Sequence, residues 1–471
     1  MASTADLPYK MRVTPDNTGL WHIKQTDEAA KKVSELLQED MEVSSPQAPR
    51  LLQRKNTSTT HIPHHLLALY GTGAAPSALQ AAYRANNTYQ RPALAPHTPS
   101  LAQTQATFHP WPAAARPRFG DEAYYPDFLR FFQAEMKREG GWKNVVGRYL
   151  FGLGLGVDKE GDGVGGGGGD ELLVRLFAGI LHPLIQLMYG VEWGQEAVVA
   201  EGLAQAAVHS GDLGRFLLAA EEKARAAAGG GKEGGVGVLE LMAEIRRDPK
   251  LKGAARDSDP EKIRDGVFAR AREEMIALAA RVRVRPDEVE EKTAEMFDAA
   301  VYVAAAAAVM KEGKQPKFDF FFMHHVNSSP FFVAINAQDW IPAEAKARLL
   351  EWKIRMDLLQ YAARGAPELS VEKLAAYQPR KPKAGGSLAD IVARLHTYED
   401  DGHSIKLARA AVICRNICKK YEDEGKGWLK VKGDDMWSKV CHLIVDSVEA
   451  PGERWLRSCG FDEAWKDVPD I

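Results

Sequence analysis

Apolar residues recur three and four positions apart over most of the chain, which is the spacing of helices that bury one face or several. The clearest runs are rich in alanine and leucine and span residues 170–194, 194–210, 212–228, 293–313 and 343–365. Strand-like alternation with a period of two is nearly missing. The pattern therefore predicts an all-α fold, with residues 61–471 forming a single large multi-helix domain.

Irregular segments interrupt this helical pattern. Residues 1–60 are polar and broken by prolines, which predicts a long irregular N-terminal arm with one short helix over residues 26–40. Residues 91–120 carry many prolines and predict a long ordered loop. Residues 156–171 and 228–237 are glycine-rich but lack the GxxxxGK(S/T) pattern of a phosphate-binding loop, so we interpret them as insertions between helices.

Composition and charge then exclude several classes of protein. The 471 residues carry a formal net charge of −3, which gives no electrostatic case for binding nucleic acid or an anionic membrane. The four cysteines include no CxxC pair, so neither a disulfide scaffold nor a thiolate zinc site is expected. The first residues form no apolar signal segment, and the most apolar run, 301–310, is too short to span a bilayer. A cytoplasmic protein is expected.

Familiar catalytic motifs are missing as well. The sequence GLGLG at residues 152–156 lacks the third glycine spacing of a dinucleotide fingerprint, and no βαβ pattern surrounds it. The chain contains neither the GxSxG nucleophile elbow nor the HExxH zinc motif. Histidines embedded in apolar helices are the chemistry that remains.

Three of these histidines lie within residues 61–65, at the start of an apolar run. On a helix, with about 100° per residue, His65 lies close to the apolar face and His61 at its margin, one turn earlier. His64 points toward solvent, and Pro63 must lie in the first turn. His61 and His65 can therefore offer two imidazoles to one metal ion; the alternative is a helix start whose histidines bond locally.

His182 lies in the run 170–194, which is apolar on nearly all sides. A buried histidine is unfavourable unless it is hydrogen-bonded or bound to a metal. Pro183 disfavours α geometry at His182 and predicts a kink there. The ring is either a ligand or a core histidine bonded to a carbonyl that the kink frees.

His324 and His325 are surrounded by aromatic residues in the sequence FDFFFMHHVNSSPFF. One of the two can face inward, at the wall of an aromatic pocket; the alternative is a half-buried helix with one hydrogen-bonded histidine. His209 ends an apolar helix, where the macrodipole favours a histidine. His403 lies near a helix start beside acidic residues, as a ligand, a substrate contact or a solvated residue.

Lys353 lies at the border of the apolar face in the run 343–365. A lysine at such a border ordinarily extends its ammonium to water. The alternative is a lysine buried deeply enough to be neutral, which can react with carbon dioxide and provide an anionic oxygen ligand.

Several segments in sequence order resemble one known family. They include HIPHHLLALYGTGAAPSALQAAYRANNTYQRP, YYPDFLRFF, LHPLIQLMYGVEWG, EGLAQAAVH, KFDFFFMHHVNSS, LLEWKIRMDLLQYAARGAPEL, DDGHSIKLARA and GFDEAW. Together they resemble the fungal questin oxidase-like family, from about residue 60 to the C-terminus. No single motif is diagnostic; their order and number carry the resemblance.

The resemblance implies an O2-dependent oxygenase that opens the quinone ring of an anthraquinone in fungal polyketide secondary metabolism. The reaction is formally a Baeyer–Villiger insertion and is described as NADPH-dependent, although this sequence lacks a dinucleotide fingerprint. Without a flavin, a redox metal is the natural agent for activating O2. We therefore expect a mononuclear non-haem iron centre, Fe(II), with NADPH as a further reductant.

The residues expected to form this centre come from the matched segments. The expected iron ligands are His61, His65, His182 and His324, with Lys353, in carboxylated form, as an oxygen donor. His209 and His403 are the reserves, and either can act as a base toward a substrate phenol. The aromatic residues expected to line a flat substrate pocket are Tyr89, Phe320, Phe321, Phe322, Trp352 and Tyr361.

Two other classes of function stay open. A metal-free, NADPH-dependent Baeyer–Villiger-type monooxygenase would need no iron and would use the substrate itself as a flavin-like reductant. A non-enzymatic helical partner of another enzyme would turn over no anthraquinone. The sequence predicts neither a nucleic-acid nor a membrane partner, and it does not indicate an oligomeric state.

Overall fold

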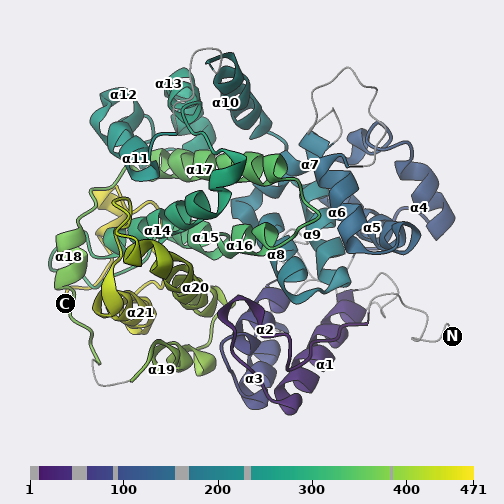
Figure 1. The fold of residues 1–471 in the computed structure, drawn as a ribbon, viewed down its shortest axis with the longest axis horizontal. Helices are drawn as coiled ribbons and strands as arrows, with labels where there is room; N and C mark the ends of the chain where they lie inside the picture. The colour runs from purple at the N-terminus through teal and green to yellow at the C-terminus, as the bar shows by residue number, and fades with distance from the viewer. Residues whose placement is uncertain (1–9, 45–60, 88–93, 154–168, 228–234, 382–385) are drawn as a thin grey trace. The chain divides into compact units, whose positions relative to one another are not determined.

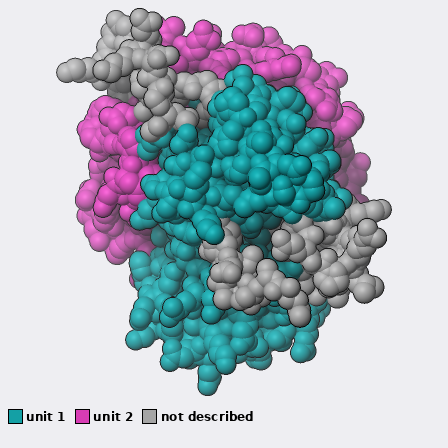
Figure 2. Space-filling view, turned by 90° about the vertical axis from the view of Figure 1, so that its right-hand side faces the viewer, with its two compact units in different colours: residues 1–214, 396–402 teal, residues 215–395, 403–471 magenta. Residues whose placement is uncertain are grey.

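The computed structural model describes residues 10–44, 61–87, 94–153, 169–227, 235–381 and 386–471 (Figure 1). Over these residues the chain is helical and forms no strand; two isolated bridges, Lys314 with Asp470 and Asp319 with Leu456, are its only β pairing. The all-α prediction is therefore confirmed. The chain forms two compact units, residues 1–214 with 396–402 and residues 215–395 with 403–471 (Figure 2).

The first unit is built from nine helices among the residues that the structure describes. They are α1 (Asp27–Ser44), α2 (Ile62–Tyr70), α3 (Pro76–Asn87), α4 (Leu101–Phe108), α5 (Tyr125–Glu139), α6 (Trp142–Phe151), α7 (Gly169–Leu176), α8 (His182–Trp193) and α9 (Glu196–Val208). Helix α1 confirms the helix expected over 26–40, whereas α4 corrects the prediction that 91–120 is loop throughout. The Ser100 side chain caps α4 by accepting from the Gln103 N–H, which provides a helix start inside the proline-rich segment.

Helices α8 and α9 approach each other closely because each has a glycine at the contact (Figure 1). A Cβ on Gly190 would lie 2.6 Å from the Val199 nitrogen, and a Cβ on Gly202 would lie 2.7 Å from the Leu187 nitrogen. Nearly every residue of both helices is buried, in agreement with their apolar sequences. Helix α8 of this closely packed pair begins at His182.

Helix α2 packs against α1, α3 and α8 and is buried along its whole length. Its N-cap is His61, and Pro63 lies in the first turn, where its missing N–H removes no hydrogen bond, as expected. The helix has no polar face in its sequence, and all nine of its residues are buried. This corrects the prediction that His64 points toward solvent, since His64 is 0% exposed.

The break before α8 lies at different residues from those the sequence predicts. His182 itself has helical angles, φ −60° and ψ −43°, while Ile180 and Leu181 adopt positive φ values of 57° and 64°. Pro183 therefore sits in the first turn of α8 rather than in a kinked helix interior. No single helix of the described residues is long and apolar enough to cross a membrane. Asp170–Leu176 and Gly179–Trp193, which are bent by 68° relative to each other, satisfy the criteria of length and composition only when they are taken together.

The second unit contains the remaining helices that the structure describes. They are α10 (Gly214–Ala227), α11 (Val238–Arg247), α12 (Pro249–Lys252), α13 (Arg272–Ala279), α14 (Val289–Ala308), α15 (Phe320–Asn327), α16 (Pro330–Asn336), α17 (Ala343–Ala363), α18 (Val371–Ala376), α19 (Leu388–Ala393), α20 (His403–Asp423) and α21 (Gly433–Glu449). Helix α14 packs against α15, α17 and α20 and forms the centre of this unit (Figure 1). Its run of alanines favours a helix and lets the neighbouring helices approach.

Parts of the predicted irregular segments fall outside the described residues. These include residues 45–60, which contain the expected boundary of the N-terminal arm, and nearly all of the two glycine-rich insertions. The predicted division into an arm, 1–60, and a domain, 61–471, stays a prediction.

Candidate functional site

Two histidines of the first unit face each other through the same ring nitrogen. The Nε2 atoms of His61, at the start of α2, and His182, at the start of α8, are 3.0 Å apart. The Nδ1 of His182 lies 2.6 Å from the Gly179 carbonyl oxygen, which can only accept, so His182 carries its proton on Nδ1. The Nδ1 of His61 lies 3.4 Å from a carboxylate oxygen of Asp401. Both rings are therefore oriented by acceptors on their far sides.

The second unit repeats this arrangement with another pair. The Nε2 atoms of His324, on α15, and His403, at the start of α20, are 3.1 Å apart. His324 donates its Nδ1 proton to the Phe320 carbonyl oxygen at 2.6 Å, one helical turn earlier. The two side chains belong to residues that are 0% and 2% exposed. His403 thus pairs in the structure with His324, a partner that the sequence pattern did not indicate.

In each pair, the facing Nε2 atoms must avoid a repulsion between their two lone pairs. A neutral imidazole with its proton on Nδ1 has a lone pair on Nε2, and two such lone pairs at this distance repel. A ring that carries its proton on Nε2 and donates it to the other Nε2, or a cation bound by both nitrogens, removes that repulsion. Two nitrogens that bind one ion at about 2.1 Å and at right angles lie about 3.0 Å apart. The histidines present therefore fit a metal ion, and their far-side acceptors are those typical of metal-bound histidine.

The other two histidines of the opening run have different partners. His65 accepts at Nδ1 from the Asn86 side-chain nitrogen at 2.9 Å, so a neutral His65 carries its proton on Nε2. His64 bonds through Nε2 to Gln186, and Gln186 donates to Glu201 at 2.5 Å. His64 also stacks on Tyr189 with ring centres 5.7 Å apart. The structure therefore pairs His61 with His182, and it does not bring His65 into that pair.

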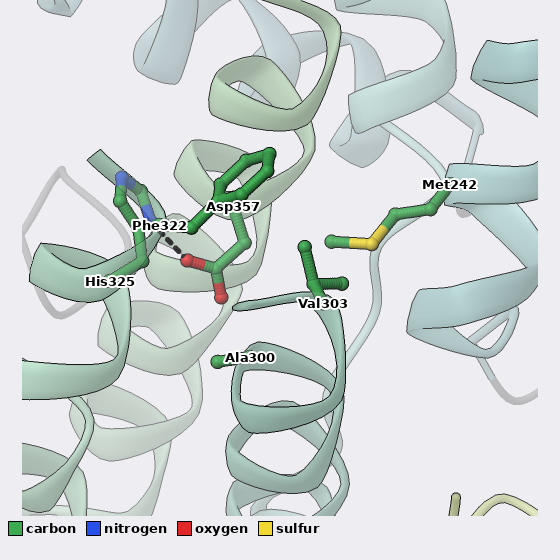
Figure 3. Close-up of a pocket in the computed structure, with 6 residues that line it drawn as sticks. All are labelled: Met242, Ala300, Val303, Phe322, His325 and Asp357. Carbon is green, nitrogen blue, oxygen red and sulfur yellow. Dashed lines mark hydrogen bonds and ion pairs between the residues drawn. The ribbon is translucent and has the colours of Figure 1, made fainter. Parts of the chain in front are cut away.

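Lys353 and His325 meet at one buried carboxylate on α17. Asp357 Oδ1 accepts from the ammonium of Lys353, one turn earlier, at 2.5 Å. The same oxygen accepts from the Nδ1 of His325, as Figure 3 shows. Burial lowers the pKa of Lys353 and of His325, although Asp357 opposes both shifts. An ammonium fits beside Asp357 better than a carboxylated lysine would, because the carboxylated form is itself an anion. The structure thus places Lys353 in this cluster, paired with an acid.

A small cavity lies beside this cluster. It is lined by His325, Asp357, Phe322, Met242, Ala300 and Val303, and Figure 3 shows Asp357 between His325 and the apolar side chains. The second oxygen of Asp357, Oδ2, is buried and has no hydrogen-bond partner in the part of the chain that the structure describes.

The remaining predicted residues are spread over both units. His209 donates its Nδ1 proton to the Gln205 carbonyl oxygen at 2.6 Å, and burial lowers its pKa. Trp352 is 0% exposed, under the guanidinium of Arg348. Tyr361 donates to the Pro367 carbonyl oxygen and lines a cavity of about 420 Å³. Tyr89 lies outside the described residues.

The three consecutive phenylalanines separate in the structure. Phe320 packs edge-on against His324, with ring centres 4.5 Å apart, and lies 5.6 Å from the ring of His403. Phe321 contacts Phe320, while Phe322 stacks toward Tyr361. Phe320 is therefore the predicted pocket residue that borders the second histidine pair.

Sequence reasoning missed two charged residues close to these histidines. Asp401 contacts His61, and Lys406 lies three residues after His403 on α20, where it is 3% exposed. A charge inside an apolar helix was the available signal for Lys406, and the paired acids Asp400 and Asp401 were the signal for the contact. In the short segment Asp401–Gly402–His403, Asp401 thus contacts His61 and His403 pairs with His324.

Comparison with known proteins adds an independent line of evidence. The family model described as questin oxidase-like matches residues 59–411. The Baeyer-Villiger oxidase of Pestalotiopsis fici is 35% identical over 416 residues, which cover 87% of this chain and 88% of that protein. Questin oxidases of Aspergillus fumigatus and Aspergillus terreus are 34% and 30% identical, and cover 87% and 97% of this chain and 88% and 97% of their own lengths.

Proposed function

The chain belongs to the questin oxidase-like family, and on that premise we propose that it is an O2-dependent oxygenase that opens the quinone ring of an anthraquinone in fungal secondary metabolism. Relatives named questin oxidase and Baeyer-Villiger oxidase, matched over most of their lengths, support the reaction class.

The proposal takes iron as the metal and the paired histidines as its ligands. The observation that carries it is the facing of Nε2 atoms in the pairs His61–His182 and His324–His403, at 3.0 and 3.1 Å. Iron bound by imidazoles supplies the activation of O2 that ring cleavage needs. Of the ligands expected from the sequence, His61 and His182 are kept in the first unit and His324 is kept in the second, where His403 joins it. His65 and Lys353 have the other partners described above.

The protein's own groups hold these nitrogens ready to bind. Carbonyl oxygens of Gly179 and Phe320 fix the protons of His182 and His324 on Nδ1, and a carboxylate oxygen of Asp401 lies 3.4 Å from the Nδ1 of His61. Burial of His324 and His403 excludes water from their pair. His209, neutral at pH 7 because burial lowers its pKa, is the candidate base for a substrate phenol.

Metal analysis combined with an isotope assay tests the proposal. Protein purified with iron is expected to convert a hydroxyanthraquinone to a ring-opened product that contains ¹⁸O when the reaction runs under ¹⁸O2. Mass spectrometry of the product then counts the incorporated oxygen atoms, which separates monooxygenation from dioxygenation.

Other results assign the alternatives. Full activity after iron is removed by chelation, with a requirement for NADPH, would establish the metal-free monooxygenase instead. Absence of turnover by iron-loaded protein, for anthraquinones with different substituents, would favour a non-enzymatic helical partner.

A further inference from the structure

The segment 453–460 lies beside the second histidine pair. It is anchored to the start of α15 through the backbone, because the Phe320 N–H donates to the Leu456 carbonyl at 2.7 Å and the Leu456 N–H donates to the Phe318 carbonyl at 2.9 Å. Asp319 accepts from the Cys459 N–H at 2.9 Å. These bonds hold this strip of residues 453–460 against the start of α15, with an isolated bridge between Asp319 and Leu456.

The anchoring decides which side chains of the strip face the histidines. Leu456 is buried, 4% exposed, whereas its neighbours Trp455 and Arg457 are half-buried and exposed, respectively. The Trp455 ring lies 6.3 Å from the His403 ring, and the guanidinium of Arg457 lies 4.4 Å from the centre of the Phe320 ring. Trp455, Phe320 and Arg457 are all at least partly exposed, so they form an accessible edge around a buried pair.

The charge of this edge is positive. Within the described residues Arg457 lies against the Phe320 ring and is paired with no carboxylate. A second guanidinium, that of Arg364, lies 3.8 Å from the centre of the neighbouring Phe321 ring, but it is buried and bonded to Ser458. Arg457 is therefore an accessible cation of the strip, more exposed than the half-buried Arg454, and its planar group already lies against an aromatic ring.

We propose that Trp455 and Arg457 form a substrate-recognition edge, in which Arg457 binds the ionised phenol oxygen of a planar aromatic substrate and Trp455 and Phe320 contact its rings. The proposal rests on the proposed function and names Arg457 as a specificity-determining residue. Flat aromatic ligands pack on aromatic side chains at ring distances of about 4.5–7 Å, and a guanidinium prefers an anionic oxygen.

The position of the strip in the chain agrees with a role in specificity. The residues matched by the family model end at 411, whereas the strip follows α21 and lies beyond them. The histidines that it borders fall inside the matched region. A segment of this kind can change the preferred substrate without changing the groups that carry out the reaction.

A binding experiment on the full-length protein tests the proposal. Dissociation constants are measured by tryptophan fluorescence quenching for a hydroxyanthraquinone, at a pH where its phenol is ionised, and for its neutral O-methyl ether. We expect R457Q to weaken phenolate binding about tenfold while binding of the ether changes less than about twofold. R457K keeps the charge and is expected to lose less. The matched control is R272Q, whose guanidinium lies 5.2 Å from the centre of the Phe268 ring.

Salt gives a second measurement. Raising the salt from about 50 mM to about 500 mM is expected to reduce the preference of the wild-type protein for the phenolate, and to leave R457Q unaffected. Equal losses for both ligands in R457Q, no loss at all, or wild-type protein that binds neither ligand would each overturn the proposal.

The proposed function fails independently of this inference. If the wild-type protein binds the phenolate through Arg457 but cleaves no anthraquinone under O2, the recognition edge is supported and the proposed reaction is contradicted. If the wild-type protein and R457Q both cleave anthraquinone and have the same ligand preference, the proposed reaction is supported and the recognition edge is contradicted.

Discussion

The ring nitrogens of His182 and His324 determine what the two histidine pairs can bind. Each ring donates its Nδ1 proton to a backbone carbonyl oxygen at 2.6 Å, so its Nε2 atom can bind another imidazole or a metal ion. We expect His182→Ala and His324→Ala each to lower bound iron and ring-opening activity about 100-fold, because a metal site loses affinity steeply with each ligand. Elemental analysis and a product assay measure the two effects.

A matched variant controls for the loss of a buried imidazole. His396 is also a partly buried histidine, but its Nε2 contacts the Thr72 hydroxyl at 3.1 Å rather than another histidine. His396→Ala is expected to retain iron and activity. If His182→Ala and His324→Ala also retained both, with unchanged folding, the paired nitrogens would have no metal role.

Asp357 provides the negative charge that balances the buried ammonium of Lys353 in the second unit. Its Oδ1 bonds to both Lys353 and His325, and Lys353 is 0% exposed. Asp357→Asn leaves the buried lysine without an anion, so we expect a loss of about 3–5 kcal/mol in the free energy of unfolding. The double variant with Lys353→Met is expected to recover much of that loss, because no unpaired charge remains.

Urea unfolding of the two single variants and the double variant measures this coupling. Additive losses in the double variant would mean that Lys353 and Asp357 do not stabilise each other. A carboxylated Lys353 would give the opposite sign, because Asp357→Asn would then relieve a repulsion between two anions.

Among helices, the contact between α8 and α9 leaves no room for a side chain at its glycines. A Cβ on Gly202 would lie 2.7 Å from the Leu187 nitrogen and 2.8 Å from its Cα, and backbone atoms cannot rotate away. We expect Gly202→Ala to lower the free energy of unfolding by about 1–3 kcal/mol and to displace α8, which begins at His182. Chemical denaturation measures the loss. Gly427→Ala, with nothing within 4 Å, is the control and is expected to be near neutral.

The helices themselves were predictable from the sequence, but their surroundings were not. Periodicity and alanine content predict α14 and α17 well because those signals are local. The orientation of His64 was wrong because a wheel assumes one solvent-facing side, and α2 is buried all round. The sequence predicts the break before α8 at His182 because Pro183 signals it. The structure has it at Ile180 and Leu181, which take positive φ values that no local pattern predicts for such residues.

For the whole molecule, the candidate site depends on contacts between distant parts of the sequence. His61 and His182 are 121 residues apart, and His324 and His403 are 79 residues apart. Because burying a histidine is unfavourable unless it is hydrogen-bonded or bound to a metal, the apolar sequence around each histidine indicates that it needs a partner, but not which residue the partner is. The sequence pattern therefore gives His403 only as a reserve, and it does not indicate Asp357, the partner of Lys353 one turn away on the same helix.

The stability of the folded chain is also expected to depend on pH through Asp298. This carboxyl lies on α14 and accepts the backbone N–H groups of Lys430 at 2.8 Å and Val431 at 3.1 Å, but burial outweighs these bonds and raises its pKa from 3.8 to about 7. Between these values the folded state holds a proton that the unfolded state has released. The stabilisation is thus complete below about pH 4 and is lost as the pH rises through about 7.

Asp298→Asn removes this titration and retains one acceptor oxygen. We expect the variant to be less stable than the wild-type protein at pH 5 by about 1 kcal/mol, since one of two hydrogen bonds is weakened. Between pH 5 and pH 8 the variant should gain about 2.5 kcal/mol relative to the wild-type protein. Urea unfolding at several pH values measures the difference, with Asp435→Asn, at a side chain that is 85% exposed, as the control. Parallel pH profiles for Asp298→Asn and wild type would show that Asp298 is ionised in the folded protein and that its two N–H donors outweigh burial.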